Sequence, residues 1–241
     1  MKPLLLIIFS SVLSVSAFQN SYCQDTIKAQ VKNGYTIEKS GKLTVAGNYV
    51  EGKREGAWLT YYPTGVLNKV EEYHNGKKNG IVLEIDNKGT ITSQATYLDD
   101  KLDGVSKSYA RAGKFNWEKH YKKNKLHGLT KLYYDGGTLQ EEAWYANGLR
   151  DSITTWYDSQ GHKVVCNHYK EGKFDGTSFT YYPGGQVKSE KNYVMDVPQG
   201  PYKEFDEQGV MRLSGNYIYG EKKGAWLTYD ESGKVIAKEK F

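Results

Sequence analysis

Adjacent carboxylates are the first residues in this sequence whose types could support chemistry. Among these pairs are Glu71-Glu72, Asp99-Asp100 and Glu141-Glu142. Two carboxylates can perform general acid–base catalysis when both reach one substrate. On a β-strand, however, neighbouring side chains point to opposite faces and cannot meet at one substrate. We therefore interpret the pairs as solvated surface residues and expect no catalytic residues and no enzyme.

The histidines are the second candidates, as metal ligands. They are His74, His120, His127, His162 and His168. The pair His120 and His168 is 48 residues apart, which corresponds to about 19 Å if it spans four strand spacings of a sheet. Ligands of one metal ion lie about 2 Å from it. We expect no metal site and no cofactor.

Lysine recurs at regular intervals and could bind a polyanion. The set is Lys53, Lys77, Lys101, Lys125 and Lys173. Such an edge could hold anionic lipid head groups in a chain whose formal charge is +5. Acidic residues follow two positions later and offset this charge, at Glu55, Asp103, Asp151 and Asp175. Lysines at exposed loops also discourage aggregation. A lipid or polyanion edge remains the alternative function, and nucleic acid is not expected as a partner.

A fixed interval of 24 residues organises these positions. Tyrosine occurs at eight positions with this spacing, from Tyr49 to Tyr217, and the next step is Phe241. Glycine has the same spacing from Gly41 to Gly233. A third series runs from Gly56 to Gly224, with Ser152 replacing one glycine. The chain is therefore an array of repeats.

Two turns are predicted in each repeat. A series of glycine, asparagine and aspartate through Gly52, Gly76, Asp100 and Asn124 indicates a positive φ. The segment Tyr62-Pro63-Thr64-Gly65-Val66 fits a three-residue loop built on a type I turn. We expect His74-Asn75-Gly76 to close in the same way. The predicted turn glycines are Gly52, Gly65, Gly76, Gly89, Gly113, Gly137, Gly148, Gly161, Gly172, Gly185, Gly209, Gly220 and Gly233.

The elements between these turns are predicted to be strands. Residues 66–73 and 77–86 have strand length, and no segment shows a helical apolar period. With three-residue loops throughout, the odd positions such as Tyr61, Leu67 and Tyr73 would form one aromatic and aliphatic face. The predicted fold is all-β: an elongated antiparallel array of eight 24-residue β-hairpins in a single twisted sheet.

The beginning of the chain has a different composition. Lys2 is followed by an apolar run from Leu4 to Val15 and by small residues. This pattern predicts a signal peptide at 1–17. We expect a flexible segment at 18–32 and the repeat domain at 33–241, with a half-unit cap at 33–46. The two cysteines, Cys23 and Cys166, are interpreted as unrelated thiols. The expected location is exported: periplasmic, outer-envelope or secreted.

The repeat resembles a known family. Tyr73-His74-Asn75-Gly76-Lys77-Lys78-Asn79-Gly80, preceded by Tyr61-Tyr62-Pro63-Thr64-Gly65, is similar to the MORN repeat and, more closely, to the bacterial MORN-variant proteins of the YwqK antitoxin type. The resemblance covers residues 33–241. It implies stacked antiparallel hairpins and a role in binding or scaffolding.

The leading hypothesis is therefore an exported, non-enzymatic module that binds another protein, and a toxin–antitoxin system is one setting for it. Large side chains interrupt the otherwise polar even-numbered face in the middle repeats. We predict a contact surface there or, alternatively, cross-strand packing. The residues are Leu132, Tyr134, Trp144 and Trp156, flanked by His120, His168 and Tyr182.

Overall fold

The computed structural model describes residues 31–110 and 113–241. The chain divides into two units, Met1–Val31 and Lys32–Phe241, and the fold is that of the second unit. The predicted signal peptide, Cys23 and most of the predicted flexible segment lie outside the described residues. Among the residues described, no helix is long and apolar enough to cross a membrane.

The second unit consists of β-strands and turns. Its strands are β1 (Gly34–Ser40), β2 (Leu43–Val50), β3 (Lys53–Tyr61), β4 (Leu67–His74), β5 (Lys77–Ile85), β6 (Ile91–Leu98), β7 (Lys101–Tyr109), β8 (Phe115–Lys122), β9 (Lys125–Tyr133), β10 (Leu139–Ala146), β11 (Leu149–Tyr157), β12 (Lys163–Lys170), β13 (Lys173–Phe174), β14 (Gly176–Tyr181), β15 (Val187–Val194), β16 (Val197–Phe205), β17 (Met211–Ile218), β18 (Glu221–Tyr229) and β19 (Val235–Lys240).

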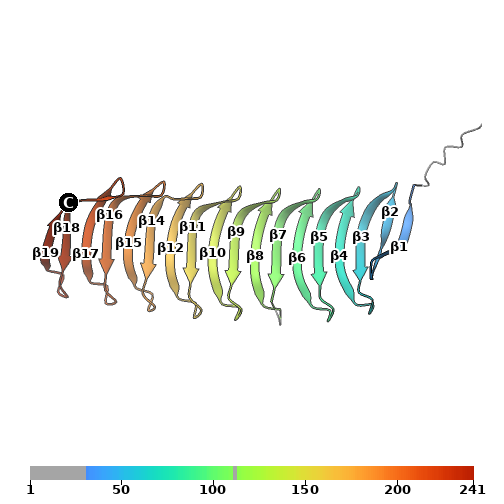
Figure 1. Cartoon of the computed structure of the whole chain (residues 1–241), viewed down its shortest axis with the longest axis horizontal. Helices are drawn as coiled ribbons and strands as arrows, with labels where there is room; N and C mark the ends of the chain where they lie inside the picture. Colours follow the sequence, from blue (N-terminus) through green and yellow to red (C-terminus); the bar gives the residue numbers. More distant parts are fainter. Residues whose placement is uncertain (1–30, 111–112) are drawn as a thin grey trace, which may run out of the picture. The chain divides into compact units, whose positions relative to one another are not determined.

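These strands form one open antiparallel sheet in the order of the chain. Each strand pairs with the strand before it and the strand after it, as β3 does with β2 and β4. β13 and β14 are two pieces of one strand, since both pair with β12. Figure 1 shows the strands side by side as bowed ribs, coloured from blue at β1 to red at β19. The predicted fold class is confirmed.

One margin of the sheet carries three-residue turns, as predicted, except between β1 and β2, where Gly41 and Lys42 form a two-residue turn. In the first of them the Tyr62 N–H donates to the Val66 carbonyl at 2.8 Å, and the Gly65 N–H donates to the Tyr62 carbonyl at 2.9 Å. Gly65 has φ +83°, the left-handed conformation that ends a type I turn in this loop. The same bonds close the loops at Gly89 and Gly137.

The other margin carries two-residue turns, and here the predicted three-residue loop is wrong. His74 pairs directly with Lys77, so Asn75 and Gly76 alone form the loop. Their φ values are +52° and +80°, which define a type I′ turn. This turn is favoured because its twist matches the right-handed twist of the flanking strands. The positive φ predicted at Gly76 is confirmed.

The shorter loop and a one-residue bulge beside each three-residue turn, such as that between Thr60 and Tyr61, change which residues share a face, because paired residues on antiparallel strands point to the same side. Trp58 pairs with Glu71, and Glu71 pairs with Val82. The face that these residues define, the inner face, therefore combines even positions of β3 and β5 with odd positions of β4. The prediction of one face made of odd positions is wrong. Nearly all the buried side chains lie on the inner face.

Tryptophan packs the inner face near both ends of the array. Trp58 is 1% exposed, Trp226 is 3% exposed, and each lies over a glycine of the preceding strand. A Cβ atom added to Gly47 would lie 2.4 Å from the Trp58 ring, and one on Gly215 would lie 2.2 Å from the Trp226 ring. Tyrosine completes both clusters at an edge-on angle, with ring centroids 4.9 Å and 5.2 Å away. Neighbouring strands thus form the core without a second layer.

Candidate functional site

The fold separates the residues of the predicted contact surface. Leu132 and Trp156 both pair with Glu141 and lie on the inner face. Trp144 pairs with Leu129 on the opposite, outer face. The two-residue turn Asn147-Gly148 causes this separation, and the bulge at Ser152, with φ +71°, preserves it because it shifts the register by two residues. The two tryptophans therefore cannot contact one partner surface together.

Trp156 is part of the inner packing. The Arg150 guanidinium carbon lies 5.3 Å from the Trp156 ring centroid and 5.8 Å from that of Tyr145. Arg150 also forms an ion pair with Glu141. Burial alone would lower the pKa of Arg150, but the hydrogen bond and the charge of Glu141 outweigh it and raise the pKa. These contacts assign Trp156 a structural role.

His120 and His168 also have structural roles. The Nδ1–H of His120 donates to the Leu129 carbonyl at 2.6 Å, and that of His168 donates to the Thr177 carbonyl at 2.8 Å. Both carbonyls follow a bulge glycine on the neighbouring strand. Thr96 and Asn192 make the same bond in other repeats, both at 3.0 Å. The polar side chain at this position therefore satisfies the backbone of the bulge.

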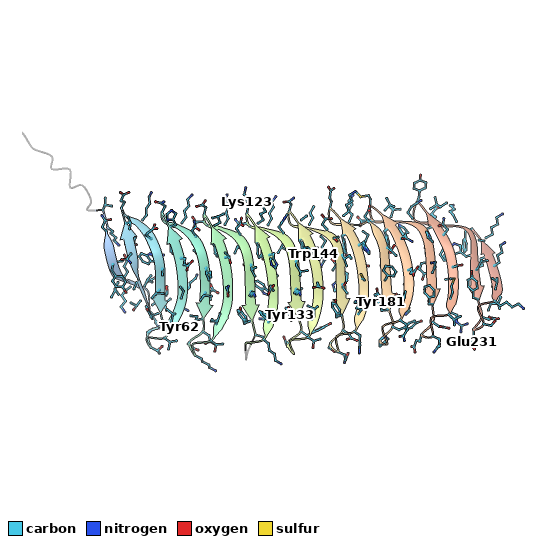
Figure 2. The ribbon with its side chains drawn as sticks, turned by 180° about the vertical axis from the view of Figure 1, so that it is seen from behind. Tyr62, Lys123, Tyr133, Trp144, Tyr181 and Glu231 are labelled. Atoms are coloured by element: carbon cyan, nitrogen blue, oxygen red, sulfur yellow. The ribbon has the colours of Figure 1, made fainter. Side chains whose placement is uncertain are left out.

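Trp144 occupies the repeat position of His120 and His168 but does not bond the backbone of the bulge. Glu72 is its equivalent in an earlier repeat and accepts a hydrogen bond from the Ile81 N–H at 2.9 Å. The Trp144 indole makes no hydrogen bond within the described part of the chain. It is 49% exposed, and Figure 2 places it between the two margins of the sheet. Trp144 is thus a large ring at a position where other repeats need a polar group.

Aliphatic side chains extend the outer surface around Trp144. Leu129 is its direct partner, and Val105 and Ile153 have the same place on the neighbouring repeats. Ile153 is also exposed. We define these four residues as the Trp144 patch. The ion pairs Lys107–Glu118 at 3.1 Å and Lys131–Glu142 at 3.3 Å lie on the same face. An apolar centre beside paired charges resembles the centre and rim of a protein interface.

Tyr134 and Tyr182 belong to the three-residue margin. Their hydroxyls donate to carbonyls of the following repeat, at 2.8 Å to Tyr157 and 3.0 Å to Phe205. Other repeats have aspartate at this position, and Asp86 instead accepts the N–H groups of Lys88 and Thr90 in its own turn. Both residue types hold the margin together, which is a structural role.

The predicted lysine edge follows the two-residue turns. Lys53, Lys77, Lys101, Lys125 and Lys173 are all exposed, each as the first residue of its strand. Leu149, Val197 and Glu221 interrupt the series. Figure 2 labels Lys123 at this margin and Tyr62 at the other.

The acidic residues near these lysines have a role that sequence reasoning missed. Glu55 accepts the N–H of Asn75 at 2.8 Å, and Asp103 and Asp175 each accept the first N–H of the next two-residue turn at 3.3 Å. The Asn75 N–H and the His74 ring lower the pKa of the Glu55 carboxyl. The sequence does indicate this role, because the same position holds a hydrogen-bond acceptor in successive repeats, including Gln199.

An open sheet of stacked hairpins is the architecture of a repeat-based binding or scaffolding module. Four stretches, residues 54–75, 126–148, 174–195 and 222–241, match the family model of the MORN repeat variant. The chain therefore carries MORN repeat variants at these places, as the sequence resemblance indicated, and proteins with such repeats are generally binding modules. The YwqK antitoxin assignment is not confirmed. A comparison with curated proteins gave no match.

Proposed function

We propose that the protein is an exported, non-enzymatic module that binds another protein through the Trp144 patch. The observation that carries this proposal is the half-exposed indole at a position where other repeats bond the bulge backbone. Tryptophan is enriched among the residues that dominate binding energy at interfaces. The regular sheet on both sides would hold the patch in a fixed geometry.

Photocrosslinking in the native host tests the proposal. A photoreactive amino acid replaces Trp144, and a matched variant carries it at Leu227, on the outer face near the end of the array. We expect a protein adduct at position 144 that is absent at position 227. Equal adducts at the two positions, or none, would overturn the proposal. A toxin in the adduct would link the protein to a toxin–antitoxin system.

Stability separates binding from packing. Trp144→Ala should change the free energy of unfolding by less than about 0.5 kcal/mol, as for most surface substitutions. The same variant should no longer capture, in a pull-down, the protein identified in the crosslinked adduct. Trp156→Ala should cost about 3 kcal/mol because it leaves a cavity on the inner face. A large loss of stability in Trp144→Ala with full partner capture would assign Trp144 to packing.

The exposed lysine edge supports a second candidate, binding of anionic lipid. Flotation with phosphatidylserine vesicles at low salt, compared with phosphatidylcholine vesicles, tests it. Charge reversal at Lys77, Lys101 and Lys125 should abolish flotation if the edge binds lipid. Flotation that ignores both salt and charge would remove this candidate. Fractionation of the host culture tests the proposed export.

A further inference from the structure

A cavity of about 310 Å³ lies on the inner face, away from the Trp144 patch. It extends from β4 to β8, and its small residues are Val82, Ala95 and Ser106. Val82 and Ser106 are the equivalents of Trp58 in the next two repeats. The cavity therefore forms where the repeat has lost the bulky side chain that fills the inner face near the ends of the array. Its volume suits a small ligand.

Four charged side chains gather at the β4–β5 end of the cavity and balance one another. The Lys78 Nζ lies 2.9 Å from a Glu71 carboxylate oxygen. The Lys69 Nζ lies 3.5 Å from Glu71 and 3.6 Å from Glu84. Burial alone would raise the pKa of Glu71, but the hydrogen bonds and charges of Lys78 and Lys69 outweigh it and lower the pKa. This end is therefore polar and has no excess charge.

Aromatic rings line the other end, and a lysine lies beside them. Trp117, Tyr97 and Tyr121 line the cavity. Lys119 is the neighbour of Ser106 in the sheet, and its Nζ lies 4.7 Å from the Trp117 ring centroid. It forms no ion pair with any residue that the structure describes. The Ser106 hydroxyl is buried, with 2% of the residue exposed, and has no hydrogen-bond partner among residues 31–110 and 113–241. Burying a hydroxyl without a hydrogen-bond partner costs free energy, and a bound ligand could supply that partner.

We propose that this cavity binds an acidic sugar residue of a polysaccharide. The flat rings of Trp117 and Tyr97 suit the C–H face of a pyranose. Ser106 and Glu84 offer a donor and an acceptor for sugar hydroxyls. Lys119, which contacts the Trp117 ring and forms no ion pair with a described residue, supplies the positive charge that a sugar carboxylate needs. A neutral sugar would leave this charge without a partner, and a cationic ligand would be repelled by it. The site is independent of the proposed protein-binding patch on the outer face.

Calorimetric titration of the purified chain tests the proposal. The probes are oligogalacturonides and hyaluronan oligosaccharides, with cello-oligosaccharides as the neutral control. We expect saturable binding of at least one acidic probe and binding of the neutral probe weaker by about tenfold or more, the loss typical of one charged hydrogen bond. Failure of both acidic probes, or equal affinity for the neutral one, would overturn the proposal.

Matched variants locate the site. Lys119→Gln should weaken acidic binding by about tenfold, whereas Lys173→Gln, which removes one exposed edge lysine, should leave it unchanged. Trp117→Ala should abolish binding, and Trp117→Phe, which keeps a ring, should retain part of it if the alanine variant does not fold. Equal losses in the two lysine variants would indicate charge attraction alone and overturn the site. Saturable binding of unfolded casein peptides in place of sugar would assign the cavity to protein recognition and also overturn it.

Discussion

Ser152 has a backbone conformation that its residue type disfavours. Its φ is +71°, and seven equivalent positions in other repeats hold glycine. Ser152→Gly should therefore raise the free energy of unfolding by about 1 kcal/mol. Urea denaturation measures the change. As a control, Ser108→Gly on β7 should be destabilising, because glycine there adds freedom to the unfolded chain and removes the hydroxyl that accepts a hydrogen bond from Asn116. A loss of stability in Ser152→Gly would show that the serine side chain holds the bulge.

Glu71 links two lysines on the inner face and should make stability depend on pH. Its pKa lies below the ordinary value of 4.5 in the folded protein, so its contribution is complete above that value and is lost as the pH falls through the folded-state pKa. Glu71→Gln should cost about 2 kcal/mol at neutral pH. The difference from the original protein should shrink in acid, as measured by urea denaturation at several pH values.

Glu84 provides the control for Glu71. Its side chain is 55% exposed and makes a single ion contact at 3.6 Å. Glu84→Gln should change stability by less than about 0.5 kcal/mol, as expected for exposed pairs. If the cost of Glu71→Gln were the same at neutral and acidic pH, its charge would not be the cause.

Individual site residues were only partly predictable. The size of Trp144 on a polar strand distinguished it in the sequence. Its separation from Trp156 could not be predicted in the same way, because it depends on the length of the loop at Asn147-Gly148, where three residues were expected and two are found. His120 and His168 were predicted to flank a contact surface, because their bonds to backbone carbonyls cannot be read from residue type.

The two-residue turn sets the faces of the sheet together with the bulge beside each three-residue turn. Its second residue also joins repeats, because the Gly76 N–H donates to the Arg54 carbonyl at 2.9 Å. Where this residue is Asp100 or Asn124, its side chain accepts a backbone N–H from the preceding repeat as well, at 2.8 Å and 2.7 Å. Asparagine and aspartate thus replace glycine at this position with a compensating bond.

Substitutions at Gly76 test this account. Gly76→Val should cost about 1 kcal/mol or more, because a β-branched residue resists φ of +80°. Gly76→Asn should be nearly neutral, because its side chain can accept the Arg54 N–H. There is room for the change, since an added Cβ atom would lie 3.4 Å from the nearest atom, in Lys53. Equal shifts in melting temperature for the two variants would contradict the turn assignment.

The turns could be predicted from the sequence wherever a residue type indicates the backbone dihedral angle. Positive φ selects glycine, asparagine and aspartate, so the repeat length and both turn positions were predictable. Loop length was harder to read. Asn75-Gly76 is a strong type I′ signal, but Lys123-Asn124 and Met195-Asp196 conceal the same turn in other repeats. Without the loop length, odd and even positions could not be assigned to faces.

At the scale of the whole array, stability should be local. Trp226 contacts Tyr202, Tyr217 and Phe241, with ring centroids 5.2–6.1 Å away. Trp226→Ala should speed hydrogen exchange in β17–β19 and leave β3–β12 unchanged, because repeats are stabilised by their neighbours. Exchange mass spectrometry measures the effect. Faster exchange throughout would mean that the array opens as one cooperative unit.

The bonds between repeats also have a consequence for synthesis. The Tyr62 hydroxyl reaches the Ile85 carbonyl, 23 residues further along the chain, and every strand pairs only with its neighbours in sequence. Contacts of such short range allow rapid folding. Each hairpin that leaves the ribosome needs only the hairpin before it as a template. A nascent chain should therefore be a shorter, already folded array. Little of its apolar surface should remain exposed until later parts of the chain are synthesised.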